Sequence, residues 1–262
     1  MRIDLSRKKA LVGASTSGIG KAIALQLAAC GASVTLMSRN KEKLVAVLNE
    51  LDTSKQQKHG YLVVDFNNFG SFKTIITQFL SENSIDILVN NTQGPPSGSV
   101  LDKTPDDYQQ AFDLLFQNIV ATTLTAIQAM KENQYGRVIN VASVSVKEPL
   151  SHLALSNAIR SALVSWSKTL ATEVAKDRIT VNTILTGYFN TERLEGLLHT
   201  KAEASGASFE SIKKEKEAEV PSNRFGNPEE YGYLAAFLAS DLASYITGAN
   251  IPIDGGLLRS PW

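Results

Sequence analysis

The 262-residue sequence predicts an α/β fold, with one parallel sheet of about seven strands and helices on both faces. Two observations lead to this prediction. Short apolar runs alternate along the chain with longer segments of helical periodicity, and the apolar runs are continuous rather than interleaved with polar residues. Such strands are buried on both faces, and right-handed crossovers then produce a doubly wound sheet of the Rossmann type.

Each expected strand is a short apolar run, and each expected helix carries apolar residues at helical spacing. The expected strands lie, in chain order, at residues 10–12, 33–37, 61–64, 85–89, 137–141, 179–184 and 249–253. The expected helices lie near residues 18–29, 41–51, 72–80, 106–130, 152–175 and 229–238. The chain contains no internal repeat and no interdomain linker, so we expect residues 1–262 to form a single domain.

One region departs from the alternation. Residues 192–222 are polar and rich in Lys, Glu, Ala and Ser, which predicts a helical insertion between the sixth strand and the last helix. Two roles are open for it. It is either a solvated helical excursion or a mobile lid over the pocket, because insertions at the carboxyl ends of strands line the ligand crevice.

Charge and cysteine content narrow the function classes. Lys and Arg number 26, as do Asp and Glu, and this balance argues against nucleic acid as a partner. The single cysteine, Cys30, excludes an intramolecular disulfide. No apolar stretch reaches the ~18 residues of a membrane span, and the N-terminal residues lack the apolar core of a signal peptide. We therefore expect a cytoplasmic protein that does not bind membranes.

A glycine-rich turn between the first strand and the first helix predicts a dinucleotide site. Glycines let the backbone approach a pyrophosphate, and the helix N-terminus offers free N–H groups and the positive end of a dipole. The residues expected to contact the cofactor here are Gly13, Ala14, Ser15, Ser17, Gly18, Ile19 and Gly20.

The ends of the second and third strands indicate which dinucleotide is bound. An acidic residue at the end of the second strand would favour NAD(H), but this chain has Ser38 followed by Arg39. A guanidinium beside a hydroxyl suits a 2′-phosphate, so we expect NADP(H), with NAD(H) as the weaker alternative. Asp65, with Phe66 beside it, closes the third strand and is placed to receive the adenine amino group. The alternative role for Asp65 is an N-cap of the next helix.

Several further motifs, in their order and spacing, resemble the short-chain dehydrogenase/reductase family over essentially the whole chain. The matching positions are Gly18 and Gly20, Asn90–Asn91, Asn118, Ser143, Thr186–Gly187 with Thr191, Arg224–Glu230, Thr247–Gly248 and Asp254–Gly256. The chain looks like the branch of 3-oxoacyl-acyl-carrier-protein reductases. The resemblance implies NADP(H)-dependent chemistry on a keto or hydroxy group, a small-molecule or acyl-thioester substrate, and a homotetramer.

The same resemblance implies further site residues. The additional cofactor contacts are Asn91, Arg160, Gly187, Phe189 and Thr191, and the catalytic set is Asn118, Ser143, Ser156 and Arg160. Members of the family carry a Tyr-x-x-x-Lys pair where this chain has Ser156 and Arg160. The family's Leu-Ala-x-Glu run, here Leu170–Glu173, lies at its usual distance from the pair, so the register holds.

The substitution leaves the proton donor open. A serine hydroxyl is far less acidic than a phenol, and an arginine keeps the positive charge of lysine but does not deprotonate. Three replacements are conceivable. They are His152, on the same helical face as Ser156 if the helix already includes it, Tyr188 from the turn after the sixth strand, or a water relayed through Ser143, Ser156 and Asn118.

Two functions therefore stay open at the level of sequence. The first is an NADP(H)-dependent reductase or dehydrogenase with altered acid–base residues. The second is a catalytically silent dinucleotide-binding protein, which senses cofactor or serves as a partner subunit. Lyase or isomerase chemistry on the same scaffold is a third outcome, because a fold does not determine a function.

The expected homotetramer has a second argument. The two long helices carry apolar faces that are broader than one sheet is expected to cover. These faces include Ala111, Leu114, Leu115, Val120, Leu163, Trp166 and Leu170.

Overall fold

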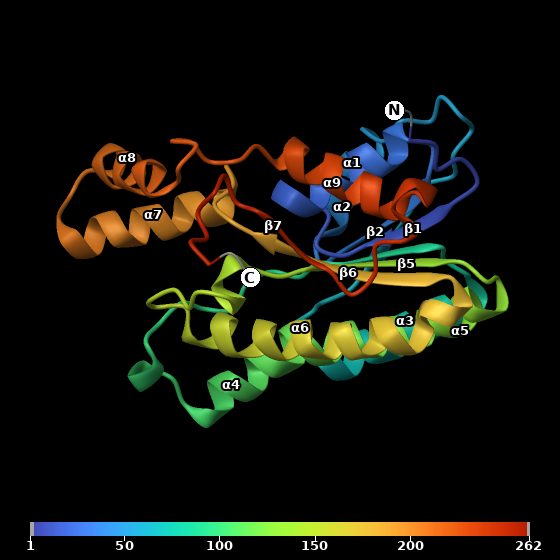
Figure 1. Ribbon diagram of the computed structural model, residues 1–262, viewed down its shortest axis with the longest axis horizontal. Coiled ribbons are helices and arrows are strands. Elements are labelled where there is room, and N and C mark those ends of the chain that lie inside the picture. Colours follow the sequence, from blue (N-terminus) through green and yellow to red (C-terminus); the bar gives the residue numbers. More distant parts are fainter. Residues whose placement is uncertain (1–2, 261–262) are drawn as a thin grey trace.

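Seven parallel strands form one sheet between two layers of helices in the computed structural model, which describes residues 3–260 (Figure 1). The strands are β1 (Lys9–Val12), β2 (Ser33–Ser38), β3 (Gly60–Val63), β4 (Ile87–Asn90), β5 (Gly136–Val141), β6 (Ile179–Thr186) and β7 (Asn250–Ile253). Their order across the sheet is β3-β2-β1-β4-β5-β6-β7. The predicted doubly wound fold is confirmed, and only residues 1–2 and 261–262 of the expected domain lie outside the described part.

The longer helices divide between the two faces of the sheet. They are α1 (Gly18–Ala29), α2 (Lys41–Leu48), α3 (Phe69–Glu82), α4 (Pro105–Phe112), α5 (Asn118–Glu132), α6 (Ala154–Val174), α7 (Glu192–Ser205), α8 (Phe209–Glu219) and α9 (Pro228–Ala239). Figure 1 shows α1, α2 and α9 on one face and α3, α5 and α6 on the other. Crossovers therefore run over both faces, as a doubly wound sheet requires.

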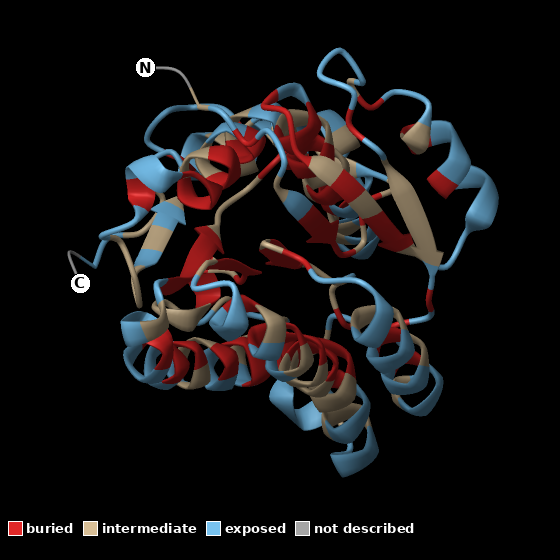
Figure 2. Ribbon diagram, turned by 90° about the vertical axis from the view of Figure 1, so that its right-hand side faces the viewer, coloured by how far each residue is buried: buried red, intermediate tan, exposed pale blue. Residues whose placement is uncertain are grey.

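Two apolar clusters hold these layers to the sheet. Ile23 and Leu27 of α1 pack with Tyr231 of α9 on one face, while Phe72 and Ile76 of α3 belong to the cluster on the other. Figure 2 shows the buried segments gathered along the strands and on the helix sides that face them. Strands β4 and β5 are buried along their whole length, which explains their uninterrupted apolar runs.

A chain of buried polar side chains crosses the middle of the second face. Asn90 Nδ2 on β4 donates to Asn140 Oδ1 on β5 at 2.8 Å and to Thr123 Oγ1 on α5 at 2.9 Å. Asn140 Nδ2 then donates to Ser167 Oγ on α6 at 2.8 Å. Because unpaired amides are costly in a dry interior, these bonds specify how α5 and α6 sit against the strands.

The predicted helix over residues 106–130 is interrupted. A π-helical turn at Asp113–Gln117 separates α4 from α5, and α5 begins at Asn118. Helical periodicity does not reveal such a turn, because it adds one residue without ending the helix. The start of the next predicted helix is also later than expected, because His152 has φ 59° and α6 begins only at Ala154.

The burial of the long helices removes one argument for a homotetramer. Ala111, Leu114, Leu115, Leu163 and Leu170 are all buried within this one chain. The sheet together with α3 and α4 covers more helix surface than the sequence suggested, since α4 and α6 pack against one another as well. These residues therefore do not require a second subunit.

The polar region after β6 forms a pair of helices with a small core of its own. Leu194 and Leu198 of α7 pack with Ile212 of α8 and with Phe225. Thr191 and Ser208 cap the two helices by accepting from the backbone N–H groups of Leu194 and Ser211, respectively. The pair lies beyond the carboxyl end of β6 (Figure 1).

No helix within residues 3–260 combines the length and apolarity needed to cross a membrane.

Strands β1 and β4 are neighbours although they lie far apart in sequence, and the strand order reverses between them. The turn after β1 meets the end of β4 closely: Gly13 N–H donates to Val89 O at 3.1 Å, and Asn91 Nδ2 donates to Gly13 O at 3.2 Å. A Cβ at Gly13 would lie 2.2 Å from Asn91 O. Any other residue there would push apart the two segments that form the ligand crevice of such sheets.

We predict that Gly13→Ala destabilises the fold by about 2 kcal/mol or more, because the added methyl group meets backbone rather than a movable side chain. The control is Gly196→Ala in α7, where a Cβ meets nothing within 4 Å. That control should be neutral or stabilising by up to about 1 kcal/mol. Urea unfolding followed by circular dichroism measures both, and equal stabilities would contradict the prediction.

Candidate active site

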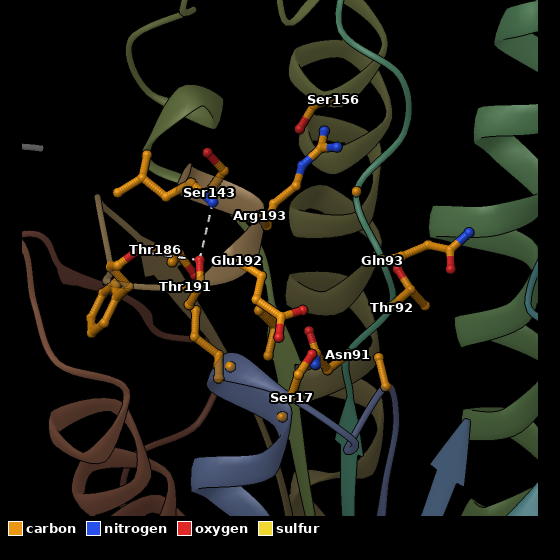
Figure 3. A pocket seen from close by; sticks show the side chains of 18 of the residues that line it. Ser17, Asn91, Thr92, Gln93, Ser143, Ser156, Thr186, Thr191, Glu192 and Arg193 are labelled. Carbon is orange, nitrogen blue, oxygen red and sulfur yellow. Dashed lines mark hydrogen bonds between the residues drawn. The ribbon is translucent and has the colours of Figure 1, made fainter. Parts of the chain in front are cut away.

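An open cavity of about 670 Å³ lies at the carboxyl ends of the strands, beside the point where the strand order reverses (Figure 3). Its walls come from the turn after β1, the loop after β4, the end of β5, the start of α6 and the segment from β6 into α7. Binding crevices of open α/β sheets occupy this position. Fourteen of the predicted site residues line it, namely Ala14, Ser17, Gly18, Ile19, Gly20, Ser38, Arg39, Asn91, Ser143, Ser156, Arg160, Gly187, Phe189 and Thr191.

The N-terminus of α1 opens into this cavity. Its N-cap, Ser17, makes no side-chain capping bond, so the N–H groups of the first turn stay available. A Cβ at Gly20 would lie 2.2 Å from Ala14 O, which explains a glycine inside this helix. Free N–H groups at the positive end of a helix dipole suit the pyrophosphate of a dinucleotide.

Two cationic side chains mark one end of the cavity. Arg39 follows β2 and Lys43 lies one helical turn later in α2, and both are exposed where they line the wall. Within residues 3–260, no carboxylate forms an ion pair with either. Sequence analysis missed Lys43, although its spacing of four from Arg39 places the two on one side of the helix start. The pair suits a phosphate on the adenosine ribose.

Five predicted residues lie outside the lining of this cavity: Gly13, Ser15, Asp65, Phe66 and Asn118. Ser15 is fully buried, and its Oγ accepts from the backbone N–H of Met37 at 3.0 Å. The exposed Asp65 accepts from the backbone N–H of Asn67 at 3.0 Å. The helix cap considered for Asp65 belongs to Asn68, which accepts from the N–H of Ser71 at the start of α3.

Asn118 stands at the junction of the π-helical turn and α5. It is buried, and its Nδ2 donates to Phe66 O at 2.7 Å, which joins it to the segment after β3. Its Oδ1 has no hydrogen-bond partner within the described chain. Asn118 lines a second, much smaller cavity together with Gly13, Phe66 and Asn91. Asn91 lines both cavities, so a proton relay through water and Asn118 would have to pass Asn91 to reach the main cavity.

Ser156 and Arg160 form a buried pair at the opposite end of the main cavity. Both lie on α6, one turn apart, and Arg160 Nε donates to Ser156 Oγ at 3.2 Å. Arg160 Nη1 also donates to Val141 O, at the end of β5, at 2.6 Å. Burial lowers the pKa of the Arg160 guanidinium to about 10, with a smaller contribution from the charge of Arg193. The guanidinium remains charged at neutral pH beside a serine hydroxyl.

Two other segments complete this end of the cavity. Ser143 follows β5, and its Oγ accepts from the N–H of Ser145 at 3.1 Å. Gly187 and Thr191 lie between β6 and α7, and Thr191 Oγ1 donates to Phe189 O at 3.3 Å. These positions bring the predicted carboxamide and catalytic residues to one wall, from segments far apart in the chain.

Arg193 is a lining residue that sequence analysis missed. It lies in the first turn of α7, and its Nη2 donates to Pro95 O, in the loop after β4, at 2.8 Å. Figure 3 shows its side chain directed into the pocket toward Ser156. Desolvation lowers the pKa of its guanidinium. In the sequence it is one of many charged residues of the polar insertion, and only its place just after Thr191 sets it apart.

Of the two side chains considered as proton donors, one lines the cavity and the other does not. His152 is exposed, precedes α6 and does not line the cavity, so it does not share a helical face with Ser156. Tyr188 does line the cavity, with its ring edge-on to Phe225 and 5.6 Å from Lys216 Nζ. Of these two alternatives, only Tyr188 is placed to meet a ligand in the cavity.

Comparison with known proteins identifies the family. Residues 13–258 match a family model described as enoyl-(acyl carrier protein) reductase. The chain belongs to the short-chain dehydrogenase/reductase family. This match spans the cofactor turn, the Ser156–Arg160 pair and the polar insertion alike, so the family resemblance inferred from the motifs is confirmed.

Individual members of the short-chain dehydrogenase/reductase family are similar over the full length. The NADPH-dependent reductase BacG of Bacillus subtilis is 30% identical, covering 98% of this chain and 100% of the relative. The 3-oxoacyl-[acyl-carrier-protein] reductase FabG of Chlamydia pneumoniae is 31% identical, covering 98% and 99%. L-sorbose reductase from Gluconobacter frateurii, solved with NADPH and L-sorbose, superposes with a TM-score of 0.92 at 29% identity, covering 99% and 100%.

Within residues 3–260, this short-chain dehydrogenase/reductase has two buried arginines, Arg137 and Arg160, which differ in their partners. Arg137 donates to Ser240 O, Gly136 O, Arg178 O and the Asp241 carboxylate. In the described part of the chain, Arg160 donates only to the Ser156 hydroxyl and to one carbonyl oxygen, that of Val141. Because its folded pKa of about 10 lies below the ordinary range of arginine, holding the charge costs folding free energy below that pH, and the cost declines as the pH rises further.

We predict that Arg160→Met leaves the stability of the unliganded protein unchanged or raises it, because a poorly compensated buried charge is removed. Arg137→Met should cost about 1–3 kcal/mol, since it leaves buried carbonyl groups without donors. Urea unfolding of both variants at neutral pH provides the comparison. An equal loss in the two would show that Arg160 is held by the fold as tightly as Arg137.

Proposed function

We propose that this protein is an NADP(H)-dependent oxidoreductase that reduces a keto group or oxidises the corresponding hydroxy group. The observation that carries the proposal is the polarity of one cavity. A helix N-terminus and the unpaired cations Arg39 and Lys43 lie at one end, and a buried serine–arginine pair lies at the other. The first end suits the phosphates of a dinucleotide, and the second suits a polarised carbonyl oxygen.

The described residues fit NADP(H) in three places. The first turn of α1 would hold the pyrophosphate, Arg39 and Lys43 the 2′-phosphate, and Thr191 the carboxamide. No acidic side chain lines the cavity beside Ser38, where a carboxylate would repel that phosphate. The relatives that bind or use NADPH support the same choice.

The serine–arginine pair gives the chain a way to polarise a carbonyl group. Arg160 Nε donates to Ser156 Oγ, which leaves the serine hydroxyl hydrogen free to be donated to a substrate oxygen. The adjacent guanidinium stabilises negative charge as it develops there. When bound, the dinucleotide supplies the hydride that adds to the carbonyl carbon. Ser156 passes its proton to the oxygen and regains one from water, because the cavity is open to solvent.

The substrate is a small molecule or an acyl thioester, and the relatives include reductases named for each kind, L-sorbose reductase and FabG. We further propose a homotetramer that functions in the cytoplasm. On α5, Leu124 is exposed and Val120 half-buried, and on α6 Trp166 is half-buried, which leaves some apolar surface for a second subunit. The single cysteine, Cys30, is buried, so the fold does not depend on a disulfide, which is compatible with that compartment.

We predict that Arg39→Ala and Lys43→Ala each raise the Kd of NADPH by about 10-fold, because each removes a charge-assisted hydrogen bond to the 2′-phosphate. The Kd of NADH, which lacks that phosphate, should change little. Lys41→Ala in the same helix, outside the cavity lining, is the matched control. Isothermal titration with the two cofactors decides the point, and equal wild-type affinities for NADPH and NADH would contradict it.

We predict that Ser156→Ala lowers kcat by about 10²-fold while leaving the Kd of NADPH unchanged, because one donor to the developing oxyanion is lost. Restoring the family pair with Ser156→Tyr and Arg160→Lys should raise kcat above wild type, since a tuned general acid contributes about 10²–10⁴-fold. Stopped-flow oxidation of NADPH with a panel of ketones and 3-oxoacyl thioesters gives these rates.

Two results would change the proposed role of Ser156 or the proposed function of the protein. If Ser156→Ala leaves turnover unchanged, Tyr188→Phe becomes the deciding variant, because Tyr188 also lines the cavity. If no substrate is turned over and the double variant gains nothing, the protein is a silent dinucleotide binder, and the absence of an acidic side chain at position 156 is the feature that favours this second function.

A further inference from the structure

A second guanidinium, that of Arg193, lies at the substrate end of the cavity. The proposed reduction of a carbonyl group by way of Ser156 and Arg160 does not involve it. Arg193 points into the pocket from α7, on the side where Ser156 lies (Figure 3). Its charge is close enough to Arg160 to oppose the protonation of that residue. Its one hydrogen bond to another described residue, from Nη2 to Pro95 O at 2.8 Å, leaves most of the guanidinium N–H donors free for a ligand.

Arg193 has no counter-ion within residues 3–260. None of the ion pairs there includes it, and burial lowers the pKa of its guanidinium. The neighbouring Glu192 also lines the cavity, but Figure 3 shows its carboxylate directed toward the side of Ser17 and Asn91. The Glu192 carboxylate and the Arg193 guanidinium therefore face different parts of the pocket.

The position of Arg193 adds a positive charge to others near it. It lies in the first turn of a 14-residue helix, where the backbone dipole contributes positive charge, although the same turn also carries the carboxylates of Glu192 and Glu195. A second guanidinium, that of Arg160, adds repulsion from the floor of the same cavity. Opposite them, Thr92 lines the wall with a buried Oγ1 that has no hydrogen-bond partner in the described chain. Two guanidinium groups without a carboxylate partner within residues 3–260, beside a hydroxyl group without a hydrogen-bond partner there, suit an oxyanion.

We propose that Arg193 binds a carboxylate of the substrate, so that the protein acts on an oxo acid or on the corresponding hydroxy acid. The planar fork of a guanidinium matches a carboxylate through two parallel hydrogen bonds. This inference rests on the oxidoreductase function proposed above. It chooses the small-molecule alternative over the acyl thioester, whose acyl group carries no charge next to the keto group.

The carboxylate of such a substrate would also position its keto group. Arg193 and Ser156 line the same end of the cavity, so a carboxylate on the first places a nearby carbonyl oxygen next to the second. Arg193 is thus a residue that determines specificity, separate from the Ser156–Arg160 pair that polarises the carbonyl. Its loss should weaken acids selectively and leave neutral ketones unaffected.

The first test compares straight-chain oxo acids, with the ketone at carbon 2, 4 or 5, with their methyl esters. We expect the wild type to prefer at least one acid over its ester by about 10- to 100-fold in kcat/KM, as one charge-assisted pair allows. Arg193→Gln should abolish that preference by raising the KM of the acid, and Arg193→Lys should restore part of it. Lys214→Gln removes one charge from the exposed side of α8 and should leave the preference intact.

The second test needs no turnover, so it separates this inference from the proposed function. Calorimetric titration of the NADP⁺-loaded protein with hexanoate and with the neutral, isosteric hexanamide measures the carboxylate preference directly. The wild type should bind hexanoate more tightly by about 10-fold or more, and Arg193→Gln should bind the two alike. This outcome supports the carboxylate site even if no ketone is ever reduced.

Three outcomes would overturn the inference while leaving the oxidoreductase assignment standing. One is equal kcat/KM for acids and esters, or higher values for a neutral 3-oxoacyl thioester, together with no preference for hexanoate over hexanamide. Another is a 10-fold or larger rise in the Kd of NADPH in Arg193→Gln with the acid preference unchanged, which would make Arg193 a cofactor ligand. The third is that inorganic phosphate and a phosphorylated ketone compete for the site while hexanoate does not bind there.

Discussion

The close contact between the turn after β1 and the end of β4 is the constraint on which the rest of the molecule depends. Gly13 exchanges hydrogen bonds with Val89 and Asn91, at a separation that leaves no room for a side chain. This contact brings the N-terminus of α1 and the loop after β4 to the same edge of the sheet. The cavity exists because these two segments, distant in sequence, are held there together with the carboxyl ends of β5 and β6.

Charge is distributed along this cavity in a way that the fold alone does not require. Four cationic side chains line it, Arg39 and Lys43 at one end and Arg160 and Arg193 at the other, against one carboxylate, that of Glu192. The chain as a whole carries no net charge, so the positive potential of the cavity is a local arrangement. Buried or confined charges without partners reduce stability, and natural proteins retain such costs mainly where ligands compensate for them.

Much of the fold and part of the site could be read from the sequence, because both depend on local patterns. Continuous apolar runs predicted the parallel strands, and the glycine-rich turn after the first of them predicted a dinucleotide site at the start of the first helix. Arg39 was identified because it directly follows a strand. Arg193 and Lys43 were missed, since nothing local separates a charge that faces a pocket from one that faces water. The burial of Ala111 and Leu115 within one chain likewise depends on tertiary packing that periodicity does not encode.

The π-helical turn at Asp113–Gln117 has a consequence for how this chain tolerates insertions and deletions. Removing one residue from an ordinary helix rotates everything beyond it by about 100° and usually breaks the core. Here the same deletion would convert the turn into regular α-helix, so α4 and α5 would keep the faces that they turn to the core. A homologue one residue shorter at this point is therefore expected to keep the sheet, its helices and the main cavity, since none of Asp113–Gln117 lines that cavity.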